Sequence, residues 1–306
     1  MAEQVLKLQE LDASQVPQRL KADYYFDFKA HPFAHAALFG GKNARSVIDA
    51  IAGLNKYLQG ALQTIVAQVK GTKKTQADFP GRSVGKFTVL LEDGAVFEPG
   101  FIVGGKDETA TLSIAQGAAV LGANIWLDSG SIAVGPGTVI EPGAGIKGPT
   151  IIGRKNEIRQ GAYFRGDILT GDGCTLRGEL KNTVVMDQGN FPHPSYLGDS
   201  LCGYGTHFGN QATSANLGIF AVIARDPIVL AVDGQQYDLG RPKVGIIMGD
   251  YSQVGCNSVS DPGTFLAPWT VVYQLSRLNK GFYGPYELIK NKPMERGVIE
   301  RSPLKK

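Results

Sequence analysis

The chain has 306 residues and a formal net charge of +3, because its 31 basic and 28 acidic side chains nearly balance. So small an excess gives no support for nucleic-acid binding, and an apolar share of 43% argues against disorder. The three cysteines form no C-x-x-C pair, the first residues lack the apolar core of a signal peptide, and no apolar run reaches the roughly 18 residues of a membrane span. We therefore expect a globular, cytoplasmic protein with buried thiols.

Residues 1–110 are expected to form a mixed N-terminal segment built around one amphipathic helix. Ser46 followed by Asp49 resembles a capping box, and Gly71 provides a stop signal. Between them, apolar residues recur at spacings of three and four: Val47, Ile51, Leu54, Leu58, Leu62, Ile65 and Val69. The pattern predicts a helix over 46–70 and leaves open what its apolar face contacts.

From residue 121 onward, apolar residues recur every six positions, with one extra residue before Val134. The first series is Leu121, Leu127, Val134, Ile140, Ile146, Ile152, Ile158 and Phe164, and the period returns as Met248, Val254, Ser260, Leu266 and Val272. Small side chains follow most of them four positions later: Thr138, Ala144, Thr150, Asn156, Ala162, Ser252, Ser258, Thr264 and Thr270. Neither a strand nor a helix has this period, which is typical of hexapeptide β-helix repeats.

The repeat predicts a mainly β fold, a left-handed parallel β-helix over 111–285 with roughly seven or eight stacked coils. Each hexad supplies one flat strand and one corner, so three hexads close a triangular coil. We expect two insertions, a proline-rich loop at 186–195 and a hairpin at 217–242 that turns at an Asp-Gly pair. Residues 286–306 are expected to be a basic C-terminal tail.

The segment Gly143–Gly148 matches the pattern G-x-G-x-x-G, but Pro149 and a strand-like T-I-I follow it. Phosphate binding by this motif requires the N-terminus of a helix directly after the glycines. A dinucleotide site here is therefore disfavoured.

The chain has four histidines, and they divide into two pairs. His31 and His35 stand four residues apart in an aromatic stretch, and we expect them to pack because no third metal ligand lies near them. His193 lies in the proline-rich loop and His207 in a coil. A metal lyase that uses this second pair as ligands is a minor alternative, since a third ligand at close spacing is missing.

The stretch Gly178–Asn216 contains E-L-K, and twelve residues separate that lysine from the histidine of H-P-S-Y-L-G-D. It resembles the acetyltransferase domain of bifunctional bacterial N-acetylglucosamine-1-phosphate uridyltransferases, and more closely their archaeal sugar-phosphate nucleotidylyltransferase/acetyltransferase relatives. The later block G-R-P-K-V-G-I-I-M-G-D resembles an archaeal G-R-R-K-x-G-x-x-x-G-D block. The matched residues of the first stretch are Lys181, His193, Ser195, Tyr196, Leu197, Gly198, Asp199 and Asn216.

This resemblance implies acetyl transfer from acetyl-CoA to the amine of a hexosamine 1-phosphate, with His193 as general base. A protonated amine cannot attack a thioester until a base takes its proton, and histidine suits that task near neutral pH. The resemblance assigns the sugar phosphate to Arg165, Lys181, Tyr196, His207 and Lys243, and acetyl-CoA to Asn216, Gly255 and Cys256. It implies no metal, and it implies a homotrimer with its sites between the prisms.

The chain departs from the family pattern in three ways. Where the family has asparagine followed by F-G-A-G-T, this chain has His207 followed by F-G-N-Q-A, a bulkier corner. Arg165 stands two residues closer to Lys181 than its family counterpart does. Residues 1–110 show no counterpart of the L-x-x-G-x-G-T-R-M loop, so uridyl transfer is disfavoured. The altered corner favours the alternative of a non-catalytic relative that binds a sugar nucleotide or a protein.

Overall fold

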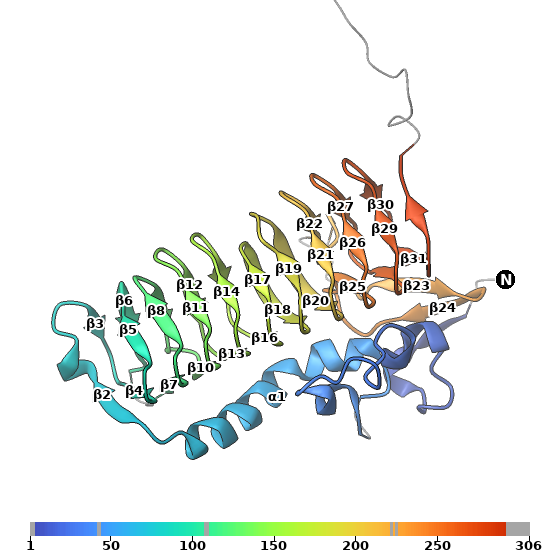
Figure 1. Ribbon diagram of the computed structural model, residues 1–306. Coiled ribbons are helices and arrows are strands. Elements are labelled where there is room, and N and C mark those ends of the chain that lie inside the picture. The colour runs from blue at the N-terminus through green and yellow to red at the C-terminus, as the bar shows by residue number, and fades with distance from the viewer. Residues whose placement is uncertain (1–3, 42–43, 107–109, 221–222, 224–225, 292–306) are drawn as a thin grey trace, which may run out of the picture.

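The chain winds into a triangular prism of stacked coils, with an N-terminal segment along one side (Figure 1). The computed structural model describes residues 4–41, 44–106, 110–220, 223 and 226–291. Each strand pairs in parallel with the equivalent strand one coil later, as β10 (Ile132–Val134) does with β13 (Thr150–Ile152). The fold is the predicted left-handed parallel β-helix.

Three flat walls form the prism, and each coil contributes one strand to each wall. The helix-covered wall comprises β4 (Phe87–Leu91), β7 (Ala110–Ile114), β10, β13, β16 (Ile168–Thr170), the second halves of β18 (Glu179–Val185) and β20 (Tyr196–Cys202), β25 (Ile246–Met248), β28 (Thr264–Leu266) and β31 (Gly281–Tyr283). The site wall comprises β3 (Ser83–Val84), β6 (Phe101–Val103), β9 (Asn124–Trp126), β12 (Gly145–Lys147), β15 (Tyr163–Phe164), the first halves of β18 and β20, β22 (Thr213–Ser214), β27 (Val259–Ser260) and β30 (Arg277–Leu278). The third wall comprises β5 (Val96–Glu98), β8 (Ala119–Leu121), β11 (Val139–Ile140), β14 (Glu157–Ile158), β17 (Thr175–Leu176), β19 (Asn190–Phe191), β21 (His207–Phe208), β26 (Gln253–Val254), β29 (Val271–Val272) and β32 (Leu288–Ile289).

The prism interior is filled by the apolar members of the hexads. From Val134 to Phe164 the predicted series is buried, and its small partners are buried in the corners beside it. These corner side chains also satisfy backbone groups, as when the Thr138 hydroxyl donates to the Gly153 carbonyl at 2.7 Å. Leu121 departs from the prediction, because Val120 faces the interior and Leu121 is only half-buried. The interval from Val120 to Ile125 is five residues rather than six, which shifts the register by one.

The stack of coils is longer than the repeat period suggests. The third wall is a 10-stranded sheet, so about ten coils stack rather than seven or eight. Strands β4 and β5 lie upstream of residue 111, and they already pair in parallel with β7 and β8. Strand β32 lies beyond residue 285, and it still pairs in parallel with β29. The six-residue period did not reveal the end coils, because their interior residues do not keep that interval. Most of the expected tail, 292–306, lies outside the described residues.

Only one of the two expected insertions interrupts the coils. The segment 186–195 is an ordinary part of a coil, since β19 pairs in register with β17 and β21 and Phe191 fills the interior. The hairpin is present as β23 (Val229–Val232) and β24 (Gln235–Asp238), with β1 (Val5–Lys7) added in parallel to β24. Its turn residues Asp233 and Gly234 both have positive φ, as a tight two-residue hairpin requires.

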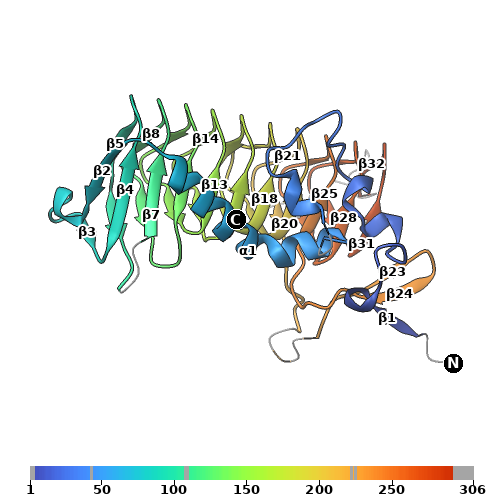
Figure 2. The ribbon, with the colours of Figure 1, turned by 90° about the horizontal axis from the view of Figure 1, so that it is seen from below.

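The predicted amphipathic helix is present as α1 (Val47–Gln68), and it lies lengthwise along the helix-covered wall (Figure 2). The Ser46 hydroxyl accepts from the Asp49 N–H at 3.2 Å, and the Asp49 carboxylate accepts from the Ser46 N–H at 2.9 Å. The buried face of α1 contacts outward-pointing apolar residues of the wall: Ala133, Ile151, Leu169, Val184 and Leu201. The helix therefore covers a wall and not an end of the prism; the first coil is instead flanked by β2 (Thr72–Thr75), antiparallel to β4.

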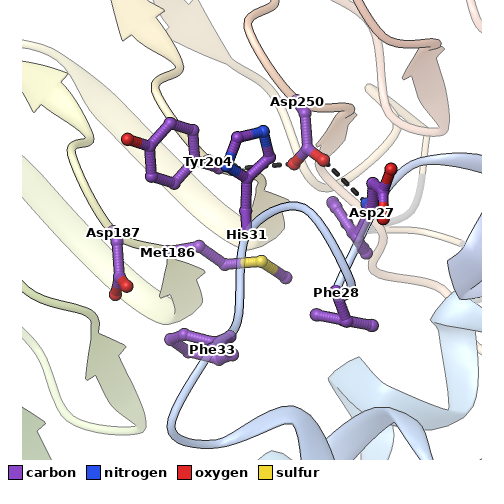
Figure 3. A pocket seen from close by; sticks show the side chains of 9 residues that line it. Asp27, Phe28, His31, Phe33, Met186, Asp187, Tyr204 and Asp250 are labelled. Atoms are coloured by element: carbon purple, nitrogen blue, oxygen red, sulfur yellow. Dashed lines mark hydrogen bonds between the residues drawn. The ribbon is translucent and has the colours of Figure 1, made fainter.

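The N-terminal segment is also held by two packed histidines, as expected for His31 and His35. The His31 ring stacks on Tyr204, with ring centroids 3.9 Å apart and planes at 9° (Figure 3). Beside it, the Asp250 carboxylate accepts from the backbone N–H groups of Asp27 and Tyr204, each at 2.8 Å. His35 Nδ1 lies 2.9 Å from the Tyr57 hydroxyl of α1. This segment occupies one wall, so the other two walls remain to form a site.

Candidate functional site

Three of the expected phosphate and sugar contacts lie on adjacent coils of the site wall. The register aligns Phe164 with Leu180, which places Arg165 beside Lys181, and it aligns Lys181 with Gly198. Tyr196 begins the strand that carries Gly198. Because adjacent parallel strands are about 4.8 Å apart, these side chains rise from one small area.

The charges in this area are only partly neutralised. The Arg165 guanidinium forms an ion pair with Glu179 at 2.7 Å, and the hydrogen bond to Glu179 raises the pKa of Arg165. Lys181 forms no ion pair with any side chain in the described ranges. Burial, followed by the charge of Glu179, raises the pKa of Tyr196, so its phenol stays protonated near neutral pH. The area combines a free cation, a paired cation and a hydrogen-bond donor.

A buried carboxylate organises the next corner of the wall. Asp199 accepts from the Asn182 and Asn216 amides, each at 2.7 Å, and from the Arg241 guanidinium at 2.6 Å. Burial lowers the pKa of Arg241, although the charge of Asp199 opposes that shift. With its amide nitrogen held in this way, Asn216 turns its oxygen toward the Tyr196 hydroxyl at 3.3 Å.

Sequence reasoning missed Asn182 and Arg241, and it gave Asp199 no role beyond its place in the motif. A signal was available, because Asp199 follows Gly198 at a corner and Arg241 stands two residues before Lys243. Asn182 and Asp199 both adopt positive φ, 47° and 48°, a conformation that asparagine and aspartate tolerate well. The contacts themselves join coils and hairpin, and spacing alone does not reveal them.

Gly198 lies directly beneath the ends of the Tyr196 and Asn216 side chains. A Cβ atom at this position would lie 2.5 Å from the Asn216 amide nitrogen and 2.6 Å from the Tyr196 hydroxyl oxygen. The phenol and the amide therefore cross directly above bare backbone. The backbone of Lys243 lies beside Asn216 and Leu217. The Val244 N–H donates to the Asn216 carbonyl at 3.0 Å, and Lys243 forms an isolated β-bridge with Leu217.

His193 projects from the corner that joins the third wall to the site wall. It is exposed, two residues after the end of β19 and three residues before Tyr196. Its side chain makes no hydrogen bond or ion pair within the described part of the chain, so both ring nitrogens face solvent or a ligand. His207 lies one coil further, on β21, where Asn190 and His207 are aligned. Burial lowers the pKa of His207, and the neighbouring His193 lowers it further.

The altered corner at 207–212 remains tightly packed. A Cβ atom on Gly209 would lie 2.6 Å from the Cys256 backbone nitrogen, so glycine is required there for coil stacking. Gln211, where the family has glycine, is exposed and adopts a left-handed φ of 57°. The glycine-alanine corner of the family is thus replaced by larger side chains in this chain.

The cysteines differ from one another in exposure. Cys174 and Cys202 are buried inside the prism, and burial raises the pKa of the Cys174 thiol to about 12 and that of Cys202 as well. Cys256 is exposed, which corrects the expectation that all three thiols are buried. It occupies the same corner position as His193, two coils further on, next to Gly255.

The expected site residues therefore lie along the site wall and at its two corners, with His193 at the corner where the chain enters the wall and Asn216 at the corner where it leaves. Arg165, Lys181 and Tyr196 share the site wall, with Lys243 at the base of the hairpin beside Asn216; Gly255 and Cys256 line the same corner as His193, and His207 lies on the third wall. Within the described ranges, no group of three or more histidine, cysteine, aspartate or glutamate side chains lies together as a metal site. No helix among the described residues is both long and apolar enough to cross a membrane.

The repeats and the three-walled prism define a hexapeptide-repeat β-helix protein. No protein-family model matches the chain. It is 27% identical over 168 residues to the bifunctional sugar-1-phosphate nucleotidylyltransferase/acetyltransferase of Sulfurisphaera tokodaii, a match that covers 48% of this chain and 41% of that protein. It is 30% identical over 112 residues to the bifunctional protein GlmU of Methanococcus vannielii, covering 37% and 25% of the two chains.

The bifunctional protein GlmU of a Cyanothece species is 32% identical over 136 residues, covering 42% of this chain and 27% of the relative. The matches confirm that the chain is related to the bifunctional nucleotidyltransferase/acetyltransferases that the sequence resembles. The chain spans between a quarter and two fifths of the length of these relatives.

Proposed function

We propose that this protein is an acetyl-CoA-dependent N-acetyltransferase that acts on an amino-sugar 1-phosphate. The observation that carries the proposal is the column of Arg165, Lys181 and Tyr196 on the site wall, next to the corner that bears His193. The word acetyltransferase in the name of the Sulfurisphaera tokodaii relative supports the reaction class. The two cations bind the phosphate, the Tyr196 hydroxyl orients the sugar, and Asn216 belongs to the acetyl-CoA site.

His193 acts as the general base in this reaction. Its ring takes a proton from the ammonium group of the sugar, and the freed amine attacks the thioester carbonyl carbon of acetyl-CoA. The tetrahedral intermediate collapses by breaking the C–S bond, and the departing sulfur takes up the second proton that the attacking nitrogen gives up, so coenzyme A leaves as the thiol. The backbone N–H of Cys256 holds the thioester and its developing oxyanion, since the N–H groups of Gly255 and Asn257 already donate to neighbouring coils. No covalent acyl-enzyme is required, so the exposed Cys256 thiol is not a nucleophile.

The complete site forms between the prisms of a homotrimer. His193 stands at the corner between two open walls, whereas α1 and the N-terminal segment fill the remaining wall. A neighbouring prism packed against that corner encloses the His193 ring and excludes water from the reacting atoms. The protein acts in the cytoplasm, a location that agrees with its three free cysteines.

The direct test is thiol release from acetyl-CoA in the presence of glucosamine 1-phosphate. His193→Ala is expected to lower kcat by about a hundredfold or more, which is the usual worth of a general base. Gln274→Ala is the matched control, because Gln274 occupies the same corner position three coils further on and is exposed. Thiol release that is absent from the wild type, or equal in wild type and His193→Ala, contradicts the proposal.

A second candidate function, that of a non-catalytic relative that binds a sugar nucleotide or a protein, is favoured by one observation. His207 and the exposed Gln211 stand where the family has asparagine and glycine, and they bring larger side chains to the corner. Calorimetry separates the two functions: binding of glucosamine 1-phosphate without binding of coenzyme A supports the second candidate.

A further inference from the structure

An aromatic platform lies on the site wall, on the N-terminal side of the proposed site. Trp126 on β9 and Tyr163 on β15 stand on either side of Gly145, with ring centroids 6.3 Å apart and planes at 66°. A Cβ atom on Gly145 would lie 3.2 Å from each ring, so both rings lean over the bare backbone. Tyr163 is 41% exposed and Trp126 is partly exposed. The two rings meet edge to face, and each exposes part of its surface to solvent.

A column of cations leads from this platform to Tyr196. Trp126 is aligned with Lys147, and the register continues through Arg165 to Lys181 on successive coils. At about 4.8 Å per coil, the column runs about 14 Å from the platform to Lys181. Lys147 pairs with Asp128 at 3.5 Å and Arg165 with Glu179 at 2.7 Å, so two acids oppose three cations.

Along the column that begins at Trp126, an aromatic ring followed by three cations matches the order of base and diphosphate in a nucleotide sugar. Nucleobases stack on exposed aromatic rings whatever their sequence identity, and lysine and arginine bind phosphates. We propose that the acceptor is a nucleoside-diphosphate-linked amino sugar, with its base on the Trp126–Tyr163 platform and its diphosphate along Lys147, Arg165 and Lys181. This inference rests on the proposed function and extends it, because it names what is attached to the phosphate of the sugar.

Coenzyme A also carries a nucleotide. Its position along the prism distinguishes it from the nucleotide of the acceptor. The corner assigned to acetyl-CoA, at Gly255 and Cys256, lies on coils C-terminal to His193. The platform lies on coils N-terminal to His193: Tyr163 shares its coil with Arg165, and Lys181 and Tyr196 lie between the platform and the coenzyme A corner. The acceptor nucleotide therefore occupies the platform, and coenzyme A does not.

The first test is calorimetric titration of the full chain with uridine diphosphate. Trp126→Ala is expected to weaken the affinity for uridine diphosphate about tenfold or more, and Trp126→Phe to retain most of it, because stacking requires only a ring. Lys147→Gln weakens binding in a salt-dependent way, whereas Lys56→Gln, on the exposed face of α1, leaves it unchanged. Saturating coenzyme A does not displace uridine diphosphate.

The second test compares two acceptors in the thiol-release assay. Uridine diphosphate-glucosamine is expected to have a kcat/KM about tenfold or more above that of glucosamine 1-phosphate, and Trp126→Ala narrows this ratio. Equal kcat/KM values, absence of uridine diphosphate binding, or its displacement by coenzyme A overturns the inference. A Trp126→Ala protein that changes oligomeric state but binds uridine diphosphate with unaltered affinity also overturns the inference, since the platform is then a subunit contact. His193-dependent turnover of glucosamine 1-phosphate distinguishes these outcomes from failure of the proposed function itself.

Discussion

At the scale of single residues, Gly198 shapes the site wall because it has no side chain. Gly198→Ala adds only a methyl group, yet it would contact the ends of both Tyr196 and Asn216 at less than 3 Å. Since both are the ends of side chains, they are expected to swing away rather than unfold the coil. We predict that kcat/KM falls roughly tenfold to a hundredfold, because small misplacements of positioning groups are costly.

The control for this substitution is another glycine-to-alanine change that meets no neighbour. Gly60 lies on the exposed side of α1, and a methyl group added to it would have no neighbouring atom within 4 Å. Gly60→Ala is expected to raise the free energy of unfolding by about 1 kcal/mol through helix propensity and to leave kcat/KM unchanged. Full activity in Gly198→Ala would show that the Tyr196–Asn216 pair does not position the substrate.

At the scale of elements, the contact between α1 and the segment before it depends on pH. Burial lowers the pKa of His35, whose ring faces Tyr57. A histidine with a lowered pKa binds fewer protons in the folded state than in the unfolded one, so stability falls as pH drops below the reference value of about 6.5 and levels off below the folded pKa. We predict that urea unfolding between pH 7.5 and 5.5 shows this loss, and that His35→Gln reduces it.

Tyr57→Phe separates burial from hydrogen bonding in this prediction. Burial is the larger cause of the lowered pKa of His35, and removal of the Tyr57 hydroxyl leaves the ring buried. The pH dependence is therefore expected to persist in Tyr57→Phe. An identical pH slope in wild type and His35→Gln would mean that the segment around His35 opens before the chain unfolds.

The elements also show how far the sequence predicts this structure. The six-residue period identified the coils from Val134 to Phe164 because each hexad there buries one branched side chain. It failed where a corner is shortened, as between Val120 and Ile125, and at 186–195, where prolines resemble an insertion although Phe191 fills the interior. The spacing of apolar residues also predicted helix α1 but not the wall against which it packs, since any apolar wall can cover the same face of the helix.

For the candidate site, the sequence predicted residue types better than it predicted contacts. Motif matching picked out Lys181 and Tyr196, which the parallel register does bring onto neighbouring coils. It did not reveal the Asp199 contacts with Asn182 and Arg241, because these join residues 17 and 42 positions apart through a corner and a hairpin. Likewise the separation of His207 from Tyr196 onto different walls depends on where each corner falls.

At the scale of the whole molecule, the prism has two walls available for other subunits. If the His193 corner is closed by a neighbour, the site wall of one chain faces the third wall of the next, an arrangement that closes into a ring after three copies. Val259 on the site wall and Val139 on the third wall are apolar and exposed, at 41% and 38%. We predict three chains per particle by sedimentation, and dissociation by either Val259→Asp or Val139→Asp.

Mixing these two variants tests the head-to-tail arrangement. Each variant keeps one intact wall, so the intact third wall of Val259→Asp can pair once with the intact site wall of Val139→Asp. The mixture is then expected to form particles of two chains but no closed ring, because every contact after the first brings a charged wall into the interface. Ala52→Asp, on the exposed side of α1, is expected to leave the trimer intact. Two-chain particles formed by either variant alone would mean that the walls pair with their own kind, and the His193 corner would then lack the neighbour that encloses it.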